Sequence, residues 1–108
     1  MTFKEIAQRF EQSESGSDSF KFFYKDVFEL MKADPLNAGL YFVVGVAAQT
    51  YVIKYEDQAV DPEFADRAKA TLHGFNSRLL EALGKGAEER LRILGEVAVD
   101  YEWKVDAF

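Results

Sequence analysis

PLNAGLYFVVGVAAQTYVI, the nineteen residues from Pro35 to Ile53, contains no charged side chain. The run stands out because 30% of the residues in this 108-residue chain are charged. Its length is close to the roughly 20 residues that a helix needs to cross a bilayer. However, Asn37, Gln49 and Thr50 are polar, and no cluster of Lys or Arg flanks the run. We therefore expect a hydrophobic helix at the centre of a helical bundle, apolar on every side, and no membrane span.

Two Asp-Pro pairs mark expected helix starts. Asp34-Pro35 and Asp61-Pro62 each place a carboxylate at the capping position, followed by a proline at the first helical position, where its missing N–H costs nothing. Pro35 also disfavours helical backbone in the residue before it, so an earlier helix must end near Ala33-Asp34. The pairs therefore predict where the uncharged helix and the next helix begin.

Apolar side chains recur at i, i+3, i+4 and i+7 on both sides of the uncharged run, which is the spacing of one helix face. The segment SESGSDS lacks apolar side chains and indicates a loop. The pattern predicts amphipathic helices over residues 2–13, 20–33, 62–83 and 87–105, with a loop over 13–19.

The last of these segments has a second interpretation. In VAVDYEWKV, residues 97–105, apolar and polar side chains alternate with the period of a half-buried strand. An α+β fold with a small antiparallel sheet including residues 97–105 is therefore the alternative. We favour an all-α bundle of four to five helices, because no turn pair such as Asn-Gly separates the candidate strands. The helical seam would contain Ala87, Leu91, Leu94, Ala98, Tyr101 and Val105.

Length and composition narrow the range of possible functions. The length predicts a single helical domain over residues 1–108. The net charge of −6 disfavours nucleic-acid binding and favours a basic protein partner. The absence of cysteine removes thiol nucleophiles, disulfides and thiolate zinc sites. The N-terminal residues do not resemble a secretory signal, so a cytoplasmic location is expected.

Catalytic patterns are missing from the sequence. His73 is the only histidine, and no carboxylate or second imidazole lies three or four residues away. The segment GKGAEER, residues 84–90, lacks the spacing of a phosphate-binding loop. We therefore expect no enzyme, no metal site and no cofactor.

The clearest candidate binding surface is on the last predicted helix. Val99 and Trp103, at i and i+4, lie on the side opposite the seam, and acidic residues surround them. An apolar anchor with a polar rim is typical of a protein interface. Packing of Trp103 on another helix or across a homodimer is the alternative. The candidate partner-binding residues are Val99, Trp103, Glu96, Asp100 and Asp106, with Phe22 as a further candidate because it falls outside the apolar stripe of its helix.

These observations predict a non-catalytic protein-binding module. The most specific version is a small acidic inhibitor or adaptor that covers a basic partner, similar in kind to bacterial immunity or antitoxin proteins. One alternative is a small-molecule-binding or sensory bundle with a pocket near Tyr41, Gly45 and Tyr51. The other is a homo-oligomeric structural subunit.

Overall fold

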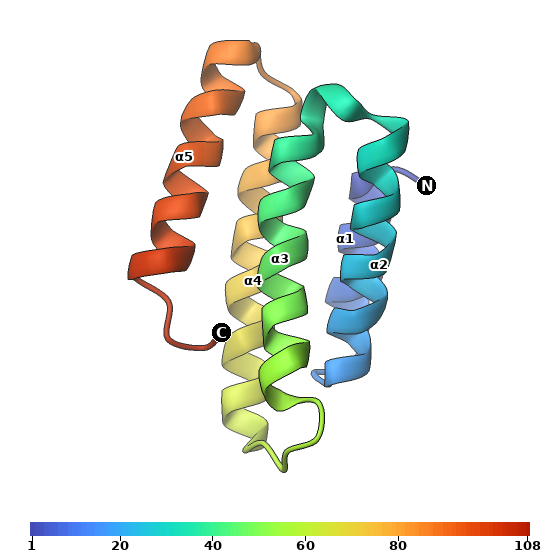
Figure 1. Ribbon diagram of the computed structural model, residues 1–108, viewed down its shortest axis with the longest axis vertical. Helices are drawn as coiled ribbons and strands as arrows, with labels where there is room; N and C mark the ends of the chain where they lie inside the picture. Colours follow the sequence, from blue (N-terminus) through green and yellow to red (C-terminus); the bar gives the residue numbers. More distant parts are fainter.

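The computed structural model describes residues 1–108 and contains five α-helices, one short 3-10 turn and no strand (Figure 1). The all-α prediction is thereby confirmed. The α+β alternative is wrong, because residues 97–103 lie inside the last helix. The elements are α1 (Phe3–Gln12), α2 (Ser17–Ala33), η1 (Pro35–Asn37), α3 (Ala38–Tyr55), α4 (Pro62–Leu83) and α5 (Ala87–Trp103).

The uncharged run forms η1 and most of α3, which lies between α2 and α5 with α4 behind it (Figure 1). By length and composition, Pro35–Tyr55 is the one helical stretch apolar enough to cross a membrane, and 44% of its most apolar window is buried inside the bundle. The predicted central hydrophobic helix is therefore present, but it is only partly buried. Phe42 is 53% exposed and Ile53 is 76% exposed, so one face of this central helix borders solvent.

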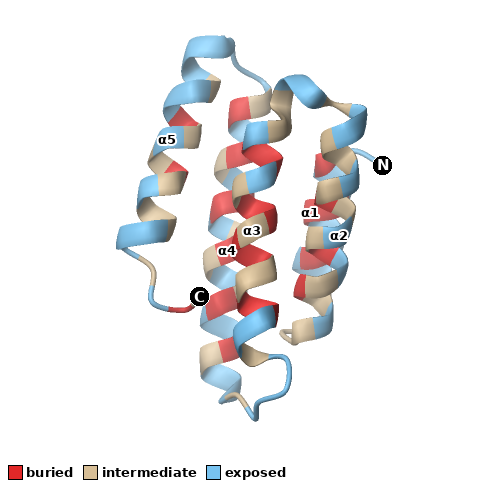
Figure 2. Ribbon diagram, in the orientation of Figure 1, coloured by how far each residue is buried: buried red, intermediate tan, exposed pale blue.

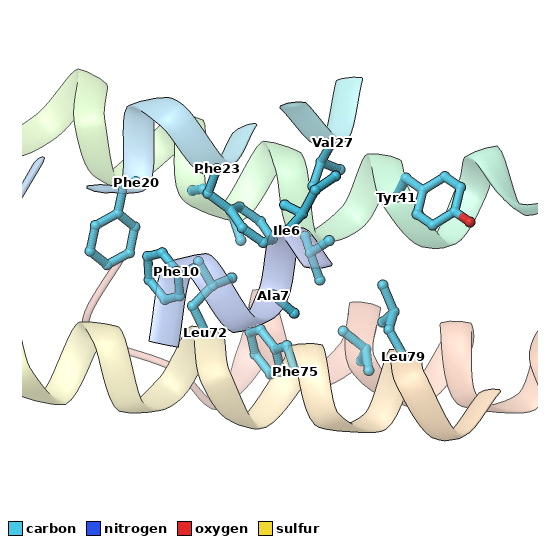
Figure 3. Close-up of a cluster of buried hydrophobic side chains, with 14 of the residues drawn as sticks. Ile6, Ala7, Phe10, Phe20, Phe23, Val27, Tyr41, Leu72, Phe75 and Leu79 are labelled. Atoms are coloured by element: carbon cyan, nitrogen blue, oxygen red, sulfur yellow. The ribbon is translucent and has the colours of Figure 1, made fainter. Parts of the chain in front are cut away.

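One hydrophobic core connects the helices (Figure 2). The short helix α1 contacts both α2 and α4, and its apolar face enters the core between them (Figure 3). Aromatic rings fill much of this space: Phe20 stacks on Tyr51 with ring centroids 4.1 Å apart, and Phe10 meets Phe20 edge-on at 5.1 Å. The segment after α5 folds back onto the core, where the ring centroids of Phe108 and Tyr51 are 6.2 Å apart.

The most extensive helix contact is between α2 and α3. It depends on Gly45, because the ring of Phe28 lies directly over this residue. A Cβ atom at position 45 would lie 2.3 Å from Phe28 Cε1, well inside van der Waals contact. The missing side chain therefore lets the two helices approach closely.

We expect Gly45→Ala to lower the free energy of unfolding by about 1 kcal/mol. The methyl group displaces the Phe28 ring, and this cost exceeds the gain of about 1 kcal/mol that alanine gives in a helix interior. Gly74→Ala is the matched control, because nothing lies within 4 Å of a Cβ atom there. That variant should be more stable than the wild type in urea unfolding. Equal effects of the two substitutions would contradict the role of Gly45.

The two Asp-Pro pairs act differently. The Asp61 carboxylate accepts a hydrogen bond from the Glu63 amide at 2.9 Å, so the predicted cap of α4 is confirmed. The predicted cap at Asp34 is wrong, because Pro35 begins the 3-10 turn η1 and α3 starts only at Ala38. The Asp34 side chain makes no capping bond and instead accepts hydrogen bonds from two side chains of the following segment.

The buried face of α5 is rotated from the predicted seam. Ile93 and Val97 are its buried residues, whereas Leu91 is 70% exposed and Ala87 is also exposed. The heptad-like spacing had placed Ala87 and Leu91 in the core. That spacing could not reveal which face of α5 the other helices cover, because this depends on how the helices are arranged in the bundle.

Candidate functional site

The three residues predicted to line a ligand pocket lie against side chains of the protein itself. Tyr41 is buried beside Phe3, with ring centroids 5.7 Å apart, and Tyr51 is buried in the aromatic stack. Gly45 faces the Phe28 ring. The structure therefore fills the space next to each of them with an aromatic side chain.

Tyr41 joins two segments of the fold through Asp34. Its hydroxyl donates a hydrogen bond to Asp34 Oδ2 at 2.6 Å, and Asn37 Nδ2 donates to the same oxygen at 2.9 Å. The hydrogen bond from Tyr41 is the main cause that holds the pKa of Asp34 below its usual range, and the bond from Asn37 adds to it. Burial and the hydrogen bond to Asp34 raise the pKa of Tyr41. The cluster fixes the joint between α2 and α3.

Tyr41→Phe should lower the free energy of unfolding by about 1–2 kcal/mol near neutral pH, because it removes a hydrogen bond to an ionised carboxylate. The Asp34 pKa is lower in the folded than in the unfolded state. The stabilisation is therefore complete above the unfolded pKa and is lost as the pH falls through the folded one. Urea unfolding at several pH values should show the gap between variant and wild type narrowing in acid.

The control is Tyr24→Phe, since the Tyr24 side chain is partly exposed on α2 and distant in sequence from Asp34. We expect it to change stability by less than about 0.5 kcal/mol at every pH. A gap for Tyr41→Phe that stays constant into the acid range would contradict the role of the Asp34 charge.

The predicted surface on α5 presents its apolar residues to solvent. Trp103 is 80% exposed and Val99 is 51% exposed. Two of the acids expected to form an acidic rim are paired with cations. Glu96 pairs with Arg92, and Asp100 lies 2.8 Å from Arg78 Nη1 and 3.4 Å from Lys104 Nζ.

These ion pairs change the electrostatics of the surface. The bond from Arg78 is the main cause that lowers the pKa of Asp100. A shallow hollow of about 570 Å³ beside Val99 has Arg78, Arg92 and Lys104 among its lining residues, against only two carboxylates. Asp106 is exposed beyond the end of α5, away from this lining. The surface around Val99 is therefore a mixture of paired charges with no acidic excess.

Phe22, by contrast, borders a pocket with unpaired acids. Its side chain is 64% exposed on α2, at a pocket of about 260 Å³ between the end of α1 and the first turns of α2. Asp18, Phe22 and Asp26 follow one another at i, i+4 and i+8, which aligns them along α2. The apolar lining residues are Ile6, Phe10, Phe22 and Phe23.

The charges of this pocket are unevenly compensated. Asp26 pairs with Arg9 across the two helices at 3.3 Å, whereas Glu14 and Asp18 are exposed and make no ion pair. Arg9 is the only cation in the lining. The nearby Lys69 ammonium donates to the Ser13 carbonyl. The pocket thus combines an apolar floor, an exposed aromatic ring and a local excess of negative charge.

Sequence reasoning missed Glu14 and Asp18. The spacing of Asp18 and Phe22 on one helix was available as a signal, but the position of α1 opposite them was not. The loop between α1 and α2 is held by a hydrogen bond from Ser19 Oγ to the Glu14 carbonyl at 2.6 Å. This bond keeps Glu14 beside the first turn of α2, on the same pocket as Asp18.

The single histidine lies beside one carboxylate. His73 Nε2 lies 3.9 Å from Glu11 Oε1, and both side chains are about half exposed. No three His, Asp or Glu side chains converge as metal ligands. Comparison of the chain with protein-family models, with curated proteins and with solved structures found no match. The function must therefore be argued from the surface itself.

Proposed function

We propose that this protein is a non-catalytic protein-binding module that takes a basic segment of its partner into the α1–α2 pocket. The observation that supports this most directly is the exposed ring of Phe22 beside two unpaired carboxylates, Glu14 and Asp18. An exposed phenylalanine ring is not in itself unusual, but few rings lie beside unpaired charges. Its position at a concave, acidic pocket makes it a suitable anchor for a partner.

The chemistry of the pocket fits a Lys or Arg side chain. The aliphatic part of such a side chain can pack on the apolar floor, while its charge reaches Glu14 or Asp18. The face of Phe22 can also attract the cation through its ring quadrupole. Because Asp26 is already paired with Arg9, the two free carboxylates supply the charge complementarity.

The charge of the whole chain supports the same partner class. A net charge of −6 raises the rate of encounter with a basic surface and opposes binding to nucleic-acid phosphates. We propose a small acidic inhibitor or adaptor acting in the cytoplasm, comparable in size and charge with immunity or antitoxin proteins. In this proposal the protein covers a basic surface of its partner and performs no chemistry on it.

The test compares capture by the wild type with capture by Phe22→Ala and Asp18→Lys. The immobilised wild type should recover from native lysate a protein with a basic surface. Its affinity, measured by calorimetry, should fall about thirtyfold in Phe22→Ala, which corresponds to a hot-spot loss of about 2 kcal/mol. Asp18→Lys should weaken binding and reduce its salt dependence, because one attractive charge is reversed.

Two matched controls separate the pocket from general effects. Phe42→Ala removes another exposed phenylalanine ring, on α3, and Glu81→Lys makes the same charge change on α4. Both variants should bind like the wild type. Equal losses in the pocket and control variants would contradict the proposed site. Recovery of no protein partner, together with thermal stabilisation by a small metabolite, would contradict the proposed function.

A further inference from the structure

The end of the molecule that contains η1 and the first turns of α5 has an apolar groove. Its volume is about 300 Å³, and its lining includes Leu36, Leu40, Leu91 and Leu94. Leu36 is 76% exposed and Leu91 is 70% exposed, so two leucines border the groove with most of their surface in water. Such a paired exposure indicates a surface that is covered by another molecule.

The polar groups of this groove define what can cover it. Arg90 is the only charged lining residue, and it forms no ion pair; its Nη1 donates to the Lys85 carbonyl at 3.2 Å. Asn37 also lines the groove, and its buried Oδ1 has no hydrogen-bond partner in the protein. The Asn37 oxygen is too deeply buried to meet a partner, so the groove suits an apolar side chain that lies beside a carboxylate.

None of the neighbouring carboxylates forms an ion pair with Arg90. Asp34 is already bonded to Tyr41 and Asn37, and Glu89 is paired with Arg92. Glu88 is exposed in the first turn of α5, but it does not line the groove. Asp34 and Arg90 attract each other, and the charge of Arg90 is one of the causes that lower the Asp34 pKa. No carboxylate pairs with the guanidinium directly, so a partner carboxylate can approach it.

The opposite end of α5 has the complementary group. Trp103 is the most exposed of the large apolar side chains, at 80%, and its indole N–H is a hydrogen-bond donor. Glu102 and Asp106 on either side of it are exposed and form no ion pair. An apolar anchor beside two free carboxylates matches the leucines and the Arg90 cation.

We propose that a second copy of this chain occupies the groove, with Trp103 of one copy inserted between Leu36 and Leu91 of the next. In this arrangement Glu102 or Asp106 approaches Arg90. Trp103 lies about 18 Å along α5 from Leu91, so a copy cannot fill its own groove. Figure 1 shows the two ends of α5 far apart, which makes the contact head-to-tail.

Trp103 is the only tryptophan and therefore reports directly on the contact. We would record its fluorescence at about 0.15 M salt while raising the protein concentration from about 1 μM to about 1 mM. Emission should move to shorter wavelengths as the indole leaves water, and sedimentation should show the mean mass rising over the same range.

Arg90→Glu and Leu91→Asp should shift this association to at least about thirtyfold higher concentration, as expected for central interface residues. Ile53→Asp is the matched control, because Ile53 is equally exposed but lies on α3. Circular dichroism would verify that each variant keeps its helices.

A mixing experiment tests the head-to-tail geometry. Trp103→Ala retains its groove and Leu91→Asp retains its tryptophan, so each should be monomeric alone and the two should form a one-to-one complex. This proposal uses no residue of the α1–α2 pocket, and it can therefore fail while the proposed function holds.

Three results would overturn it. The first is a monomer with solvent-exposed emission at every concentration. The second is association that the Arg90 and Leu91 variants do not change. The third is a wild type that stays monomeric while another protein occupies the groove.

Discussion

The close approach of α2 to α3 at Gly45 is the constraint on which the rest of the bundle depends. With the Phe28 ring seated where a side chain would otherwise be, these two helices form the broadest contact in the fold. This leaves the other sides of α3 to α4 and α5, and it leaves α1 to fill the space between α2 and α4. The aromatic stack that runs through Phe20 and Tyr51 joins α2 to α3 in the same region. The glycine and the aromatic stack thus both contribute to the contact between α2 and α3.

Much of the fold was predictable, because helical periodicity and proline positions are local signals. The capped start at Asp61 and the amphipathic face of α4 follow from neighbouring residues alone. The failure at Asp34 has a physical reason: its carboxylate is recruited by Tyr41, seven residues away, which competes with capping. The strand-like alternation over residues 97–105 was ambiguous because the sequence alone does not show which side chains of this segment are buried. Ile93 and Val97, one helical turn apart, face the core, and this burial determines the helix.

The candidate site was less predictable than the fold. Sequence spacing indicates that Val99 and Trp103 share one side of a helix, and both side chains are exposed in the structure. It does not indicate that Arg78 on α4 reaches Asp100, because that pair depends on how two helices pack side by side. The same limit hid Glu14, whose position near Phe22 depends on the path of the α1–α2 loop. Charges in a sequence can be counted, but which of them remain unpaired is a tertiary property.

This distinction decides which exposed apolar residues carry meaning. A single leucine or phenylalanine on a surface is ordinary, because folded proteins expose much apolar area. Phe42 and Ile53 belong to this kind, since they lie on the uncharged face of α3. Phe22 differs because free carboxylates border it. Trp103 lies beside Glu102 and Asp106, which form no ion pair, and Leu91 lies beside Arg90, with which no carboxylate pairs directly. An apolar anchor gives binding energy and an unpaired charge gives selectivity, so surfaces that combine both are where partners of defined chemistry should bind.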